Sequence, residues 1–196
     1  MTRLLLLCLP LFPVLYFLTL AAGSAANPGY SDLAQMPSDL GRTSSALHGA
    51  FNAGLVFSGC LGILAGAGLA SGLAAGSGAH VLAWAAGMSW GVFALSLVVA
   101  GLFPLPSPYH TAGGLVFAGI LTPILAALAL KSRPDARLVR SVLFGAFLLV
   151  GALVASALTG LVNDRYGGLL VRGLAVIMFG STAFLGVFLL RKHERA

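Results

Sequence analysis

Charged side chains are scarce in this sequence. Only 8% of its 196 residues are Asp, Glu, Lys or Arg, and Glu194 is its single glutamate. A soluble globular domain carries charge on about a quarter of its residues. The shortage therefore excludes an ordinary soluble domain. It also leaves no pair of carboxylates within the apolar segments, which a proton-coupled pump typically needs.

Cysteine is equally rare. Cys8 and Cys60 both fall within apolar runs, and neither lies at a metal-ligand spacing from a second Cys or His. We expect no disulfide framework and interpret both thiols as small packing residues. The sequence also has no nucleophilic serine motif and no glycine-rich phosphate loop, and we expect no bound cofactor.

Long apolar runs make up most of the chain. Hydrophobic residues account for 59% of it, in runs of about 20 residues, the length that crosses a bilayer. This pattern predicts an all-α polytopic membrane protein, a six-transmembrane-helix bundle with short loops that forms one integral membrane domain. The expected spans cover residues 4–22, 47–75, 81–103, 110–130, 138–162 and 169–190.

The first apolar run has two interpretations. It ends in a series of small residues, as a cleavable signal peptide does. However, it is longer than the roughly 7–15 apolar residues of a signal peptide, and we favour a retained first span.

Small residues are spaced for close helix contact in the second span, where every fourth residue is Gly or Ser from Gly54 to Gly66. This spacing predicts a central, tightly packed helix. The segment Ala53–Gly59 also resembles Gly113–Gly119, either because helical hairpins were duplicated or by chance.

The net charge of +6 comes from basic residues beside the spans, mainly in the 131–140 loop and the C-terminal tail. Basic residues in these places set topology, and they predict a multi-pass protein of the cell (inner) membrane with cytoplasmic N- and C-termini. No aromatic residues interleave them, so we expect membrane lipids as partners and no nucleic acid. The oligomeric state is left open.

Polar residues near the predicted outer ends of the spans form a candidate binding pocket. His48 and Asn52 share one helix face, and His110 opens the fourth span at the same depth. Arg172 lies one turn inside the sixth span, where a guanidinium needs a carboxylate or a phosphate. We expect Asp39 or Asp164 as its nearest acidic partner. The full candidate set is Asp39, Arg42, His48, Asn52, His110 and Arg172.

Several functions fit these residues. The preferred one is a binding protein whose pocket holds a lipid head group or a small amphiphile. The alternatives are a membrane enzyme or redox protein that uses His48 and His110 around a metal or haem, and a small transporter. A purely structural interpretation is also open. In it the histidines cap helices or meet water, and Arg42 and Arg172 form ion pairs with Asp32, Asp39 or Asp164.

Short motifs in the sequence resemble a known family. They are Ser38-Asp39-Leu40-Gly41, Asn52-x-Gly54, Gly101-Leu102-Phe103-Pro104 and His110. Their order and the span count resemble the bacterial "domain of unknown function 998" family over nearly the whole chain. The resemblance implies a six-span membrane fold, and the family has no established activity.

The chain also departs from the pattern of that family. Members commonly have Glu in place of Asp39, Gln-Arg in place of Val171-Arg172, and an acidic residue near Pro106. The missing carboxylate argues against a metal or proton role for the loop around Pro106.

Overall fold

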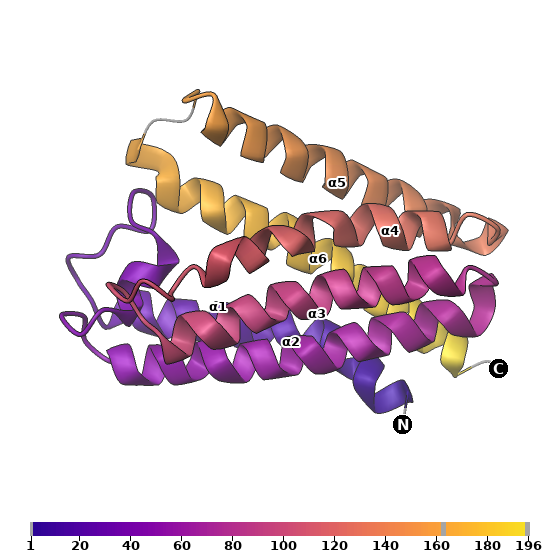
Figure 1. Cartoon of the computed structure of the whole chain (residues 1–196), viewed down its shortest axis with the longest axis horizontal. Coiled ribbons are helices and arrows are strands. Elements are labelled where there is room, and N and C mark those ends of the chain that lie inside the picture. The colour runs from indigo at the N-terminus through magenta and orange to yellow at the C-terminus, as the bar shows by residue number, and fades with distance from the viewer. Residues whose placement is uncertain (1, 162–163, 195–196) are drawn as a thin grey trace.

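The computed structural model describes residues 2–161 and 164–194, which form a bundle of helices (Figure 1). The α-helices are α1 (Thr2–Ala25), α2 (His48–Ser77), α3 (His80–Leu102), α4 (Thr122–Ala129), α5 (Arg137–Leu158) and α6 (Gly167–His193). The 3-10 helices are η1 (Pro37–Gly41), η2 (Ala112–Leu121), η3 (Pro134–Ala136) and η4 (Asp164–Tyr166). Among the described residues, five helices are apolar and long enough to cross a membrane: α1, α2, α3, α5 together with η3, and α6. The predicted all-α membrane bundle is confirmed.

The fourth predicted span, 110–130, is built differently from the others. His110 lies in a turn and does not open a helix, since η2 begins at Ala112 and α4 follows it from Thr122. The apolar helical stretch Gly114–Ala129 is shorter than the five long helices. The 3-10 conformation rises about 2.0 Å per residue against about 1.5 Å in an α-helix, so this stretch reaches roughly 28 Å. Entirely α-helical, it would reach only about 24 Å. The 3-10 half brings it close to the hydrocarbon thickness of about 30 Å.

Hydrogen bonds to α3 accompany the 3-10 conformation of η2. The main-chain N–H of Thr122 donates to Gly119, the 3-10 partner, where an α-helix would use Ala118. The hydroxyl of Ser89 in α3 donates to the carbonyl oxygen of Ala118 at 2.7 Å, and it lies 2.9 Å from the Thr122 hydroxyl. The Ser89 hydroxyl thus gives the Ala118 carbonyl group a donor in place of the Thr122 N–H.

The helices run alternately up and down between two ends of the bundle (Figure 1). One end, here called the loop end, carries the α1–α2 connection. At the other, the terminal end, α1 begins and α6 ends, and Arg3 pairs with Glu194 at 3.0 Å. Lys192 pairs there with Asp135 at 2.5 Å, which joins α6 to the α4–α5 connection. Among the described residues, most of the basic ones lie at this end: Arg3, Lys131, Arg133, Arg137, Arg140, Arg191 and Lys192.

Helices α1, α2 and α3 approach one another through glycine. A Cβ atom added to Gly66 would lie 2.7 Å from the carbonyl oxygen of Gly87, and one added to Gly68 would lie 2.5 Å from the carbonyl carbon of Leu5. Real Cβ atoms do not come this close to main-chain atoms. Because lipid offers no hydrophobic driving force between helices, such close contact supplies much of the association energy. The close packing predicted from the glycine spacing is confirmed at these positions.

Aromatic side chains fill the centre of the bundle. Phe179 of α6 lies at its middle, with ring centroids 4.8 Å from Phe12, 5.1 Å from Tyr16 and 5.5 Å from Phe93. Trp90 of α3 is only 1% exposed and packs on the same ring. The contacts of Phe179 with Phe12, Tyr16 and Trp90 are edge-to-face, an arrangement that stabilises beyond the area it buries. The cluster joins α1, α3 and α6.

Helix α5 is the most peripheral of the long helices, as Figure 1 shows. Its buried residues are Val139, Leu143, Ala146 and Val150, and none lies between Val150 and the end of the helix at Leu158. Beyond Val150 its side chains are exposed or half-buried, ending at Leu158, which is 84% exposed. Residues 151–158 of α5, toward the loop end, are therefore not enclosed by other helices.

Candidate functional site

Arg172 is the centre of the polar structure at the loop end. It lies near the start of α6, and its side chain is 14% exposed. Its Nη2 donates to the Asp32 carboxylate and to the Tyr30 hydroxyl, both at 2.6 Å. Its Nη1 donates to the carbonyl oxygens of Gln35 and Gly168, at 3.1 and 3.0 Å. The guanidinium thus fastens the α1–α2 connection to α6.

The main chain of the same connection also docks on the first turn of α6. The N–H of Leu169 donates to the carbonyl oxygen of Leu33 at 2.9 Å. Gly168 leaves room for this contact, because an added Cβ would lie 2.7 Å from the carbonyl oxygen of Asp32. The first N–H groups of a helix have no partner within it, and here the connection supplies one.

Tyr30 links Arg172 to a later part of the α1–α2 connection. Its hydroxyl accepts from Arg172 and donates to the carbonyl oxygen of Met36 at 2.9 Å. Burial raises the pKa of the phenol above its ordinary value, an effect that the hydrogen bond from Arg172 opposes. The phenol therefore stays protonated at neutral pH and keeps both bonds.

Asp39 organises the next part of the connection. One carboxylate oxygen accepts from the Met36 N–H at 3.0 Å, and the other from Arg42 Nε at 2.9 Å. Its carbonyl oxygen accepts from the Ser45 hydroxyl at 2.9 Å. His48, the first residue of α2, has its Nδ1 3.0 Å from the carbonyl oxygen of Ser45. These bonds shape the entry to α2.

Asn52 joins α2 to the end of η1. Its side-chain amide donates to the carbonyl oxygen of Gly41 at 3.0 Å, and Leu40 beside it is completely buried. From the other side α3 packs on the same turn of α2, since a Cβ added to Gly101 would lie 2.5 Å from the carbonyl oxygen of Asn52. Asn52 therefore lies where η1, α2 and α3 meet.

His110 belongs to a separate part of the loop end. Its Nδ1 lies 3.0 Å from the carbonyl oxygen of Phe103, so the ring closes the turn between α3 and η2. His48 contacts the α1–α2 connection instead. Among the described residues, no group of three or more His, Cys, Asp or Glu side chains is arranged to hold a metal ion.

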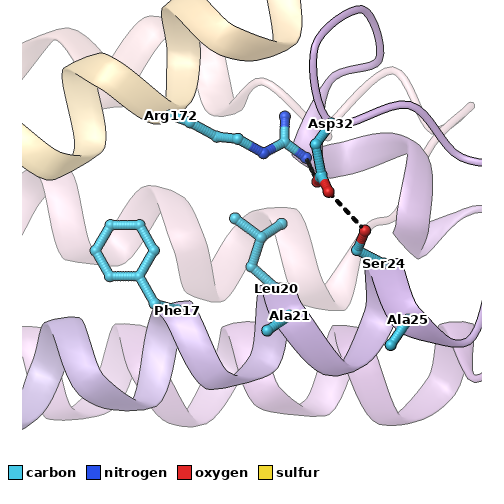
Figure 2. Close-up of a pocket in the computed structure, with 7 residues that line it drawn as sticks. All are labelled: Phe17, Leu20, Ala21, Ser24, Ala25, Asp32 and Arg172. Carbon is cyan, nitrogen blue, oxygen red and sulfur yellow. Dashed lines mark hydrogen bonds and ion pairs between the residues drawn. The ribbon is translucent and has the colours of Figure 1, made fainter.

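A cleft opens between α1, α6 and the α1–α2 connection, beside Arg172 (Figure 2). Its volume is about 630 Å³, and it is shallow and open on one side. The lining residues are Phe17, Leu20, Ala21, Ser24 and Ala25 from α1, Asp32 from the connection and Arg172 from α6. Figure 2 shows the α1 side chains along one side and Arg172 opposite, with its guanidinium turned toward Asp32.

The polar end of the cleft is a short chain of hydrogen bonds. Asp32 accepts from Arg172 through Oδ1, and its Oδ2 accepts from the Ser24 hydroxyl at 2.9 Å. The Asp32 side chain is 55% exposed, whereas that of Arg172 is mostly covered. The rest of the lining is apolar, so the cleft combines a hydrocarbon-like floor with one ion pair.

The structure brings together some, but not all, of the six residues predicted to form a pocket. Hydrogen bonds join five of them, directly or through the α1–α2 connection: Asp39, Arg42, His48, Asn52 and Arg172. His110 bonds within its own turn, and only Arg172 lines the cleft. The ion pair of Arg172 forms with Asp32, where Asp39 or Asp164 was expected. The side chain of Asp164 lies outside the described residues.

Sequence reasoning missed the importance of Asp32, Tyr30 and Ser24. Asp32 appeared among the possible ion-pair partners, but it lies 140 residues from Arg172 in sequence, and Tyr30 lies 142 residues away. Ser24 lies among small apolar residues at the end of α1. The one available signal was the buried depth of Arg172, which requires several acceptors without saying which ones.

Comparison with known proteins places the chain in one family. A family described as "Protein of unknown function (DUF998)" matches residues 11–188. The chain belongs to this family. No curated protein and no solved structure matches the chain significantly. In this DUF998 protein the motif residue Asn52 contacts both Gly41 and Gly101, and Phe103 contacts His110. The motifs that carry the resemblance therefore make contacts that hold the loop end together.

Proposed function

We propose that this membrane protein binds a lipid head group or another small amphiphile in the cleft between α1 and α6. The observation that carries the proposal is the combination of an apolar floor with the Asp32–Arg172 pair at one end. An amphiphile needs both parts, one for its chain and one for its polar group. The cleft lies on the outside of the bundle, where membrane lipid reaches it without entering the core.

The dimensions of the cleft fit this use. Small-molecule sites typically enclose about 300–1,000 Å³, and this cleft measures about 630 Å³. Its lining includes the small, exposed side chains of Ala21 and Ala25 and the half-buried ring of Phe17. A hydrocarbon chain lying along α1 would contact these residues while its polar group reaches the ion pair.

Photolabelling of the full chain tests the proposal. The protein in nanodiscs would receive a phospholipid with a diazirine in its acyl chain, and labelled peptides would be located by mass spectrometry. We expect saturable labelling of residues 17–25, reduced at least severalfold in Ala21→Trp, which fills the cleft. Gly49→Trp, on an open part of α2, is the matched control. Labelling spread evenly over all lipid-facing helices would refute the proposal.

A further inference from the structure

The ion pair in the cleft has an uneven exposure that bears on ligand charge. The side chain of Asp32 is 55% exposed, whereas that of Arg172 is only 14% exposed. The pair as a whole is neutral. A ligand that enters the cleft can therefore contact the side chain of Asp32 more easily than that of Arg172.

The hydrogen-bond capacity of the two side chains differs in the same sense. The four acceptors of Arg172 use four of the five N–H donors of a guanidinium. Asp32 accepts one bond on each oxygen, from Arg172 and Ser24, of about four that a carboxylate can accept. The site thus has more free acceptor capacity than donor capacity.

A purely anionic head group fits this arrangement poorly. Its phosphate would find one remaining guanidinium donor and would face the exposed carboxylate of Asp32 at close range. Like charges at such distances repel, most strongly where lipid and protein exclude water. A cation next to Asp32 removes this conflict.

We infer that the cleft selects a zwitterionic amphiphile with a primary ammonium group, such as phosphatidylethanolamine. This inference rests on the proposed function and names the class of its ligand. The ammonium group donates to Asp32, the phosphate lies beside Arg172, and one acyl chain follows Phe17, Leu20 and Ala21. A quaternary ammonium has no N–H to donate, so phosphatidylcholine binds more weakly.

The test compares head groups on the full chain in a neutral maltoside detergent. Native mass spectrometry would measure the binding of phosphatidylethanolamine, phosphatidylcholine and phosphatidylglycerol with identical acyl chains. For the unaltered protein we expect that order of affinity, with about tenfold between first and last, which corresponds to about 1.4 kcal/mol. Asp32→Asn should reverse the order in favour of phosphatidylglycerol, and Asp32→Glu should keep the original order.

Asp39→Asn is the matched control. It removes the same charge from the other ion pair of the α1–α2 connection, outside the lining of the cleft, and should leave the order unchanged. Loss of all saturable lipid binding would overturn the proposed function itself. If lipid labels residues 17–25 but phosphatidylglycerol binds best, or Asp32→Asn changes nothing, only the zwitterion inference fails. The order measured on the unaltered protein decides the matter even if Asp32→Asn does not fold.

Discussion

The side-chain amide of Asn52 in α2 donates to the main-chain carbonyl oxygen of Gly41, 3.0 Å away. Through this bond the α1–α2 connection is held against the helix that follows it. Gly41 is itself buried, and its missing Cβ is what lets the carbonyl group of the Asn52 side chain approach. The contact couples a hydrogen bond to a steric requirement at one place.

Substitutions at this contact should lower stability by different amounts. Asn52→Ala leaves the Gly41 carbonyl without its donor, but it also removes Oδ1, a buried atom without a hydrogen-bond partner among the described residues. We expect a loss of about 1 kcal/mol. Gly41→Ala should cost more, about 1–3 kcal/mol, because the new methyl group overlaps Asn52. Thermal unfolding in detergent measures both, and Gly49→Ala, which meets nothing within 4 Å, should lose no stability.

A double-mutant cycle at Asp32 and Arg172 should give a measurable coupling energy. Because Asp32 is about half exposed, we expect about 1 kcal/mol, the upper end of the range for surface pairs. The Arg3–Glu194 pair at the terminal end is the comparison, with side-chain exposures of 63% and 51%. Its coupling should be close to zero. Equal coupling energies in the two pairs would contradict the view that Arg172 fastens the connection to α6.

Removing the central ring of the aromatic cluster should destabilise the bundle strongly. Phe179→Ala deletes contacts with Phe12, Tyr16 and Phe93 and leaves a cavity in the core, for which we expect a loss of about 3–5 kcal/mol. Phe57→Ala is the control. Phe57 is 67% exposed, so lipid or detergent fills the space that its ring leaves, and the loss should be much smaller. Thermal unfolding of both variants in the same detergent makes the comparison.

The element formed by η2 and α4 should cross the membrane despite its short sequence. In a background without Cys8 and Cys60, single cysteines at positions 107 and 131 would mark its two ends. An impermeant maleimide should reach Ser107→Cys and Lys131→Cys from opposite sides of the membrane. Labelling of both from one side would show that the element turns back, and that the 3-10 rise does not serve to span the bilayer.

The terminal end of the bundle should face the cytoplasm. This end carries most of the basic residues. Basic residues beside membrane spans are generally retained on the cytoplasmic side. A reporter that works only in the cytoplasm should be active when fused after Ala196. A reporter that works only outside the cytoplasm should be active when inserted between residues 27 and 45. An active extracytoplasmic reporter at the C-terminus would reverse the assignment.

Composition and local pattern were enough to predict the membrane fold. Apolar length, scarcity of charge and glycine spacing are properties of individual segments. Each takes effect through the surrounding lipid or one adjacent helix, so a distant segment is not needed to interpret it. Among the described residues, the five helices long and apolar enough to cross a membrane each lie in one of the apolar runs. Even so, the similar segments Ala53–Gly59 and Gly113–Gly119 adopt different helices, α in the first case and 3-10 in the second. The contacts of Ser89 to Ala118 and Thr122 exist only around the second one.

The partners of Arg172 could be found only in the tertiary structure. The guanidinium required acceptors, and the sequence offered Asp32, Asp39 and Asp164 without a reason to prefer the first. The choice depends on how the α1–α2 connection folds back over α6. This brings Tyr30 and Asp32 into contact with Arg172, although they lie more than 130 residues from it in sequence. The same fold-back forms the cleft, because its walls come from α1, the connection and α6. A pocket made by segments so distant has no local pattern, since its geometry arises from packing between them.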